Sequence, residues 1–156
     1  MPPSRSASDV HAHVLVRVDA RKGTHAVAAR AIQNGEVITR ITGHRVVAAA
    51  DRFTVQVGAQ THIDDLGPLT YLNHSCAPNA ILDTTELTLT AIRDIAAEED
   101  LTFFYPSTEW QMAEPFACHC GTPSCVGVVA GAASLSDETM ARYFINPHIL
   151  ELRRTR

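Results

Sequence analysis

The sequence predicts a mostly β fold of short strands that ends in a short C-terminal helix. Between residues 10 and 105, short runs alternate apolar with polar residues, which is the pattern of a half-buried strand. Asn34-Gly35 between two apolar runs is a strong signal for a tight turn. Helical spacing appears only after Ser134. At 156 residues the chain is long enough for one domain with its own core.

The expected strands are short and follow one another closely. Leu87, Leu89 and Ala91 fall on one face of one strand, because successive side chains of a strand alternate between its faces. Pro106 ends the last strand, since proline has no backbone N–H to donate to a sheet. In chain order the expected strands cover residues 10–18, two strands within 26–41 on either side of the turn, 53–57 with 61–63 as its partner, 86–93 and 101–105.

The expected helices lie at the C-terminal end of the chain. Ser134-Leu-Ser-Asp137 offers capping side chains, and helical spacing follows over residues 138–144. Asn146-Pro147 ends this helix, because the residue before a proline avoids the helical region. A second short helix is expected over residues 148–154.

Composition and charge exclude several classes of protein. Hydrophobic residues make up 46% and charged residues 19%, as in globular proteins, and no apolar run is long enough to span a bilayer. The net charge of −4 argues against a generic nucleic-acid binder, which needs a basic face. Residues 1–9 lack the apolar stretch of a secretory signal and are expected to form a disordered arm. We therefore expect an intracellular protein without membrane or direct nucleic-acid contact, cytoplasmic if bacterial and nuclear or cytoplasmic if eukaryotic.

Three cysteines close together form the clearest chemical pattern. Cys118, Cys120 and Cys125 lie within eight positions, and Gly121 and Gly127 allow the tight turns that bring them together. In a reducing compartment, clustered cysteines are more often metal ligands or catalytic groups than disulfides. Closed sites of four cysteines hold structural zinc, so this pattern indicates a zinc site.

The fourth zinc ligand must come from another part of the chain, and Cys76 is the only cysteine left. His119 is a weaker rival, because its side chain points away when Cys118 and Cys120 bind together. The competing interpretation is four free thiols in a core, where cysteine is often buried. The C-x-C-G pattern with a third cysteine close behind is not typical of a core, so we expect one structural zinc ion.

Three ordered motifs carry a resemblance to a known family. Asn73-His-Ser-Cys-Ala-Pro-Asn79 is followed by Leu101-Thr-Phe-Phe-Tyr105 and then by Cys118-His-Cys-Gly121 with a third cysteine behind it. Together these motifs resemble SET-domain protein lysine methyltransferases that carry a post-SET zinc segment. The resemblance implies the family's β-clip-like fold, in which the Asn-His-Ser segment threads through a loop and gives a knot-like core. It also implies a SET domain over residues 10–113, a post-SET zinc segment over 114–131 and a C-terminal helical extension over 132–156.

The resemblance implies S-adenosylmethionine as cofactor and gives roles to individual residues. Tyr105 matches the catalytic tyrosine, and Tyr71 is a second candidate, on the wall of the channel where cofactor and substrate meet. Phe103 is a further candidate for that wall. The implied cofactor-binding residues are Gly23, Thr24, His25, Asn73, His74, Tyr105, Phe116 and His119, and the implied zinc ligands are Cys76, Cys118, Cys120 and Cys125.

The implied reaction is in-line attack of a lysine amine on the sulfonium methyl group, in a protein or peptide such as a histone tail. The alternatives are a divergent member that acts on a small molecule and a non-catalytic binding module. Three positions depart from the family: His25 replaces the second glycine of the cofactor loop, Thr70 a frequent arginine, and Phe104 the acid before Tyr105. The segment between Asp51 and Asp64, which often holds an insert, is minimal.

Overall fold

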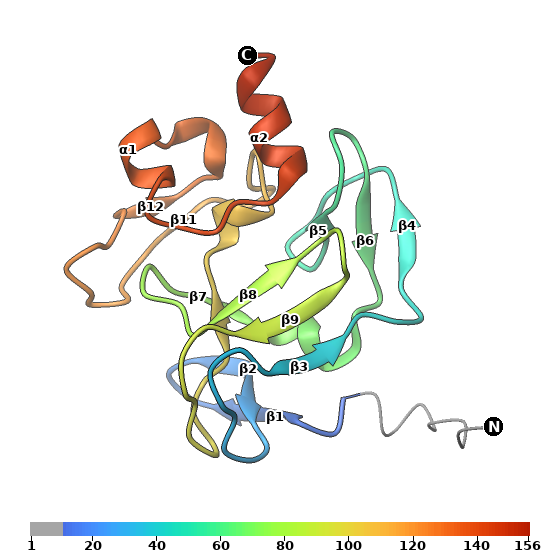
Figure 1. The fold of residues 1–156 in the computed structure, drawn as a ribbon, viewed down its shortest axis with the longest axis vertical. Coiled ribbons are helices and arrows are strands. Elements are labelled where there is room, and N and C mark those ends of the chain that lie inside the picture. The colour runs from blue at the N-terminus through green and yellow to red at the C-terminus, as the bar shows by residue number, and fades with distance from the viewer. Residues whose placement is uncertain (1–10) are drawn as a thin grey trace.

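The computed structural model describes residues 11–156, in which the strands form five small sheets rather than one large one (Figure 1). Strands β1 (Val14–Asp19) and β2 (Gly23–Ala28) form an antiparallel hairpin at one end of the molecule. Helices α1 (Asp137–Met140) and α2 (Pro147–Arg154) lie together at the opposite end. Within residues 11–156, no helix has the length and apolar character needed to cross a membrane.

Two three-stranded antiparallel sheets lie between these ends. In one sheet, β9 (Thr88–Ala91) pairs with both β3 (Val37–Arg40) and β8 (Ala80–Asp83). In the other, β6 (His62–Asp64) pairs with both β4 (Arg45–Val47) and β5 (Val55–Gln56). The remaining elements are β7 (Asn73–His74), β10 (Thr102–Phe103), β11 (Phe116–Ala117), β12 (Val128–Val129) and the 3₁₀ helices η1 (Gly67–Tyr71), η2 (Tyr105–Ser107) and η3 (Ala132–Ser134).

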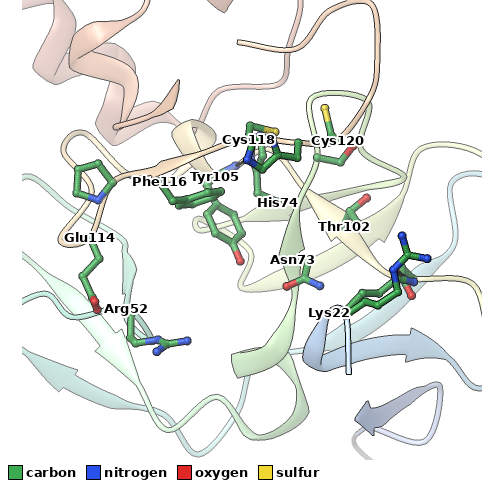
Figure 2. Close-up of a pocket in the computed structure, with 15 residues that line it drawn as sticks. Lys22, Arg52, Asn73, His74, Thr102, Tyr105, Glu114, Phe116, Cys118 and Cys120 are labelled. Carbon is green, nitrogen blue, oxygen red and sulfur yellow. Dashed lines mark hydrogen bonds and ion pairs between the residues drawn. The ribbon is translucent and has the colours of Figure 1, made fainter. Parts of the chain in front are cut away.

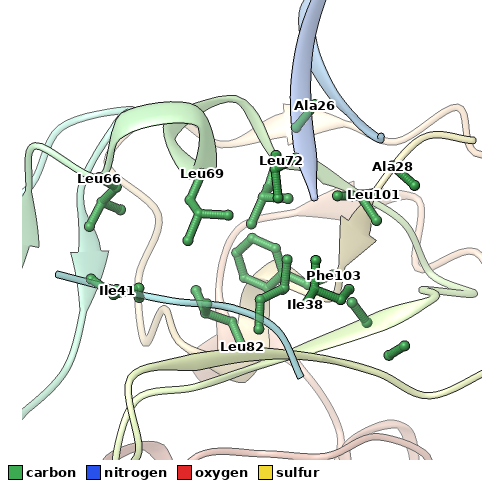
Figure 3. Close-up of a cluster of buried hydrophobic side chains, with 14 of the residues drawn as sticks. Ala26, Ala28, Ile38, Ile41, Leu66, Leu69, Leu72, Leu82, Leu101 and Phe103 are labelled. Carbon is green, nitrogen blue, oxygen red and sulfur yellow. The ribbon is translucent and has the colours of Figure 1, made fainter. Parts of the chain in front are cut away.

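The main hydrophobic core joins β1–β2, η1 and the β3–β9–β8 sheet. Figure 3 shows the Phe103 ring in the middle of this cluster, with Leu69, Leu72 and Leu82 around it. All four side chains are at most 5% exposed. Burial of this apolar surface is the main stabilising contribution to the fold, and it fixes β10 beside the segment that contains β7.

A second, smaller core lies beneath the C-terminal helices and explains one departure from the family pattern. Phe104 is 3% exposed and packs with Met140 and Ile149 in this cluster. Its ring stacks on Tyr143, with 3.6 Å between the ring centroids. Because neighbouring residues of a strand point to opposite faces, Phe103 enters the main core and Phe104 the second one. An acid at position 104 would lose this packing.

The predicted mostly β fold is confirmed, and so is the pairing of the strand at 61–63 with the strand before it. The turn at Asn34-Gly35 is also present, but the strands on its two sides pair with different partners, β2 with β1 and β3 with β9. The expected arm at residues 1–9 lies outside the described residues, as does the first residue of the expected strand at 10–18.

Several elements are shorter than the sequence pattern predicts. The strand expected to end at Tyr105 stops at Phe103, and Tyr105 begins a 3₁₀ helix that has proline near its start. Helix α1 ends at Met140 instead of continuing to residue 144. Further on, Asn146 is fully buried and donates its side-chain amide to Leu82 O at 2.8 Å and Ser107 O at 2.9 Å, which anchors the segment between α1 and α2.

Candidate active site

A large cavity opens beside the short parallel pair β7–β10. Its volume is about 880 Å³, near the upper end of the range for small-molecule and cofactor sites. Figure 2 shows Asn73, Thr102 and Tyr105 facing this space from three separate segments. The other lining residues are Arg21, Lys22, Arg52, His74, Ser75, Asp100, Glu114, Pro115, Phe116, Cys118, His119 and Cys120.

The rim of this first cavity carries both signs of charge. Lys22 Nζ lies 2.7 Å from Asp100 Oδ2, and this carboxylate raises the pKa of Lys22. Arg21 and Arg52 are exposed cations on the same lining, and Glu114 is an exposed acid. A ligand with both an anionic and a cationic group would therefore find partners in this cavity.

His74 connects the cavity wall to the cysteine cluster. Its Nδ1 accepts a hydrogen bond from the Tyr105 backbone N–H at 3.1 Å, so its Nε2 carries the proton and donates to Cys76 Sγ at 3.2 Å. Burial lowers the pKa of His74 to about 4, which keeps the ring neutral at physiological pH. The ring also meets the edge of Phe116, with 6.0 Å between centroids.

The four cysteines converge as the sequence predicts. Strands β11 and β12 pair and close a loop, in which Cys118 N donates to Gly127 O at 2.7 Å. Gly121 and Gly127 both adopt positive φ, at 71° and 82°, a conformation that costs a side-chain-bearing residue energy. The sulfurs of Cys76, Cys118, Cys120 and Cys125 all lie within 4.8 Å of one another.

This cluster fits a tetrahedral metal ion. A tetrahedron of zinc–sulfur bonds of about 2.3 Å has edges of about 3.8 Å, and the sulfurs of Cys76 and Cys118 are 3.9 Å apart. His119 is exposed and lines the first cavity instead of joining the cluster. The part of the chain that the structure describes therefore offers four sulfur ligands and no histidine at this site.

A second, narrow cavity lies on the other side of Tyr105. Its volume is about 40 Å³, and it shares only Tyr105 and Arg52 with the lining of the first cavity. Alternation along β10 separates the two spaces, since Thr102 lines the first and Phe103 the second. The other residues that line the second cavity are Phe53, Thr54, Val55, Leu66, Leu69, Thr70, Leu72, Thr108 and Glu109.

Tyr105 is held in place between the two cavities. Its hydroxyl donates to Leu72 O at 2.5 Å. Burial raises the pKa of Tyr105 to about 12, and the negative charge of Glu109 acts in the same direction. The phenol therefore stays protonated at physiological pH, and its oxygen keeps lone pairs free to accept a hydrogen bond.

Comparison with known proteins identifies the family. The SET domain family matches residues 23–106, which include β2, the Asn-His-Ser segment and Tyr105. The chain belongs to the SET-domain family. This match confirms the SET domain that the sequence motifs indicate, and the domain belongs to a family of methyltransferases. The post-SET segment lies beyond the matched residues and stays a prediction.

Named relatives and a solved structure agree with this assignment. The chain is 36% identical over 124 residues to methyltransferase flvH of Aspergillus flavus, which covers 78% of this chain and 70% of that protein. It is 35% identical to an H3 lysine-36 specific histone-lysine N-methyltransferase of Aspergillus oryzae, over 45% of this chain and only 8% of that protein. A crystal structure of KRYPTONITE in complex with mCHH DNA, H3(1-15) peptide and SAH superposes with a TM-score of 0.56 at 22% identity, over 74% of this chain and 29% of that one.

The structure brings together most of the residues predicted for the SET-domain site. Asn73, His74, Tyr105, Phe116 and His119 all line the first cavity. The lining at the β1–β2 hairpin comes from Arg21 and Lys22, one step before the predicted residues Gly23, Thr24 and His25. The cofactor contacts assigned to those three residues stay predictions.

His25 is accommodated without backbone strain. It lies inside β2 and is not among the described residues with positive φ, so the second glycine of the family's loop is not required here. Its ring is 5% exposed, and its Nε2 lies 3.6 Å from Asp100 Oδ1. Tyr71 ends η1, is 36% exposed and lines neither of the two cavities, so its predicted catalytic role is not supported by contact with either space.

The sequence motifs missed several charged residues of the site. Arg21, Lys22, Arg52 and Glu114 lie outside the motifs and reach the cavity only through the fold. Glu109 was also missed, although it follows Tyr105 by four residues and is 9% exposed. The sequence signal that could have pointed to Glu109 is its position four residues after Tyr105, because residues one helical turn apart lie close together.

Proposed function

We propose that this chain is an S-adenosylmethionine-dependent N-methyltransferase whose acceptor is a primary amine on a slender chain, with a lysine side chain of a protein or peptide as the first candidate. The observation that carries the proposal is the position of Tyr105, which is shared by a cofactor-sized cavity and by a narrow second cavity. The similar KRYPTONITE structure is a complex with both SAH and an H3(1-15) peptide, which supports a protein of this fold that takes a cofactor and a peptide together.

The first cavity has the residues to hold this cofactor. When bound, S-adenosylmethionine supplies a methyl group on a positively charged sulfur. Exposed Arg21 and Arg52 are available to its carboxylate, and Asp100 and Glu114 to its amino group. Phe116 and the neutral His74 ring offer flat surfaces to its adenine.

The second cavity suits the acceptor. A lysine amine with a pKa of about 10.4 is charged in water and must lose a proton before it can attack. Apolar walls that include Leu69, Leu72 and Phe103 disfavour the charged form. The Tyr105 oxygen is placed to accept a hydrogen bond from the amine, so the chain contributes mainly position and orientation to the reaction.

The cysteine cluster would have a structural role. Four sulfurs complete the shell of a zinc ion and leave no open position for catalysis. The ion would tie Cys76, which follows the Asn-His-Ser segment, to the loop that carries Cys118 and Cys120. Since this loop lines the first cavity, the metal would hold one wall of the cofactor site.

A small-molecule amine is the second candidate acceptor. The flvH relative, whose name states no acceptor, matches over most of both chains, whereas two histone-lysine methyltransferases match over 45% and 70% of this chain but under a tenth of their own length. Beside the second cavity, β5 and β6 are joined by a short connection of residues 57–61, which leaves little chain to recognise a folded partner. Both candidates place the reacting amine in the same cavity.

Methyl transfer can be tested directly. The chain is incubated with methyl-labelled S-adenosylmethionine and with mixed histones, a cell lysate or free n-butylamine. We expect label on a lysine side chain or on the amine, and loss of that label in Tyr105→Phe. Binding of S-adenosylhomocysteine without transfer of label to any amine would contradict the proposal.

A further inference from the structure

A buried carboxylate in the second cavity has no basic partner. Glu109 is 9% exposed, and among residues 11–156 no Lys, Arg or His nitrogen lies within 4.0 Å of its oxygens. Its Oε2 accepts a hydrogen bond from Gln56 N at 3.0 Å, and the Thr108 side chain is a second hydrogen-bonding neighbour of the carboxyl group. Burying a charge without a partner is costly, so a carboxylate at this position needs a reason beyond packing.

The backbone around Glu109 is fixed on both sides. Its own N–H donates to Tyr105 O at 3.1 Å, and its carbonyl accepts from Ala132 N at 2.9 Å. The buried Gln56 side chain accepts from Trp110 N at 2.9 Å and donates to Gly58 O at 2.8 Å. The carboxylate is therefore held in a defined place one helical turn from Tyr105.

The surroundings of this carboxylate define what it can receive. The walls of the cavity include Val55, Leu66, Leu72 and Phe103, and Glu109 is the only acid on its lining. Its volume of about 40 Å³, against about 880 Å³ for the first cavity, favours a small, slender group over a bulky one. A primary ammonium on an unbranched chain has the charge and width that this space accepts.

We infer that Glu109 receives the ammonium group of the acceptor in the second cavity and takes one of its protons before methyl transfer. This inference rests on the proposed function, because it requires that the amine enters this cavity. In the step, one N–H bond breaks, its electron pair remains on nitrogen as the attacking lone pair, and a new O–H bond forms on Glu109. The proton passes to water when the product leaves.

The apolar cavity favours this transfer. The ammonium–carboxylate pair carries two charges and the amine–carboxylic acid pair carries none, so desolvation shifts the balance toward the neutral pair. Burial also raises the pKa of Glu109 to about 7, closer to that of an alkyl ammonium. Tyr105, which also lines this cavity, keeps its proton throughout this range because burial raises its pKa to about 12.

The first test measures binding of n-butylamine and of its neutral analogue n-butanol by NMR at pH 8. The wild-type chain should bind the amine about tenfold or more tightly than the alcohol, since a charge-assisted hydrogen bond is lost with the alcohol. Glu109→Gln keeps the acceptor for Gln56 N and should lose this preference. Glu86→Gln removes an exposed acid that lines neither cavity and should keep the preference for the amine.

The wild-type chain offers a second measurement that needs no substitution. At pH 5.5 the Glu109 carboxyl is protonated and the preference for the amine should disappear, while n-butanol binds as before. His148, whose ring contacts Thr108 O at 2.8 Å, has its pKa lowered by burial, so it gains its charge at a lower pH than an ordinary histidine. S-adenosylhomocysteine binding reports whether each sample is folded.

The proton transfer has its own signature in the pH dependence of methylation. At pH 7, Glu109→Gln should methylate mixed histones about a hundredfold more slowly than the wild type, within the usual range for loss of a general base. The deficit should shrink below tenfold at pH 9.5, where water removes the proton. A constant deficit across this range would overturn the proton transfer.

The outcomes separate the two proposals. If the wild type binds S-adenosylhomocysteine but methylates no amine, the proposed function fails, and the binding measurements still decide whether Glu109 receives an ammonium. If n-butylamine and n-butanol bind the wild type equally at pH 8, the inference about Glu109 is wrong whatever the activity.

Discussion

The two cavities on either side of Tyr105 are built in different ways. The first is wide, carries both signs of charge and has one wall made by the loop between β11 and β12, which the cysteine cluster holds in place. The second is small and is lined mostly by core residues, with Arg52 and Phe53 as exposed members and Glu109 as its single acid. Under the proposed function, the wide, charged cavity holds the cofactor, and the small cavity with one acid selects the acceptor by its size and charge. The two should therefore respond independently to perturbation.

Metal removal should have the largest effect and should act on the first cavity alone. A chelator should lower the affinity for S-adenosylhomocysteine at least a thousandfold, because binding of a structural zinc contributes about 10–16 kcal/mol to folding of its segment. Calorimetry should show no change in n-butylamine binding, and added zinc should restore cofactor binding. Cofactor binding that survives in metal-free protein would break the link between cluster and cavity.

Tyr105→Phe should lower the rate of methyl transfer, because it changes the residue that lines both cavities. Loss of the hydroxyl should slow methyl transfer by about a hundredfold to a thousandfold, the usual effect of removing one positioned polar group from an active site. Binding of S-adenosylhomocysteine and of n-butylamine should change only a few-fold, since both cavities keep their walls. A variant with normal activity would show that Tyr105 separates the spaces without taking part in transfer.

Glu109→Gln should change stability in a pH-dependent way. The folded-state pKa of about 7 lies above the ordinary 4.5, so the folded chain binds more protons between these values and stability falls as pH rises through this window. The glutamine variant should lack this decline and gain about 2–3 kcal/mol over the wild type at pH 8, with no gain at pH 4. Urea unfolding of both chains measures the difference.

The control for this prediction is Glu86→Gln, an exposed acid whose replacement should leave the pH dependence of the wild type unchanged. Equal stability of the Glu109→Gln variant and the wild type at pH 8 would mean that the buried carboxylate is already compensated in the folded chain.

Two aromatic side chains at the cavity rims give the smallest expected effects. Phe116 is 37% exposed, and its replacement by alanine should weaken S-adenosylhomocysteine binding about fivefold, corresponding to about 1 kcal/mol of lost aromatic contact. Phe53, 44% exposed at the second cavity, should show the reverse pattern, with weaker n-butylamine binding only. Isothermal titration of each variant with both ligands measures these affinities. A Phe116 variant with weaker n-butylamine binding, or a Phe53 variant with weaker S-adenosylhomocysteine binding, would contradict the prediction.

The sequence predicted the first cavity much better than the second. In the cysteine cluster and the Asn-His-Ser motif, the residue types and their spacing alone indicate the chemistry. The fold brings the four sulfurs together as expected. Glu109 and Leu69 are ordinary residues that acquire a role only where η1, β5 and β10 meet. Such long-range packing has no local pattern.

The sequence pattern also did not predict where the strands end. The run Leu101–Tyr105 has the composition of one strand, but Leu101 and Phe103 enter the main core, Phe104 enters the second core, and Tyr105 begins a 3₁₀ helix. The contact between Phe104 and Tyr143 that explains the missing acid joins residues 39 positions apart, so only the folded chain reveals it.

The most direct test of the account is whether the two cavities fill at the same time. n-Butylamine is titrated at pH 8 into the chain alone and into the chain saturated with S-adenosylhomocysteine, and its affinity is measured by calorimetry. Two separate spaces on opposite sides of Tyr105 predict an equal or higher affinity for the amine in the saturated chain. Competition between the two ligands would show that they share one space and would contradict the proposed division of the site.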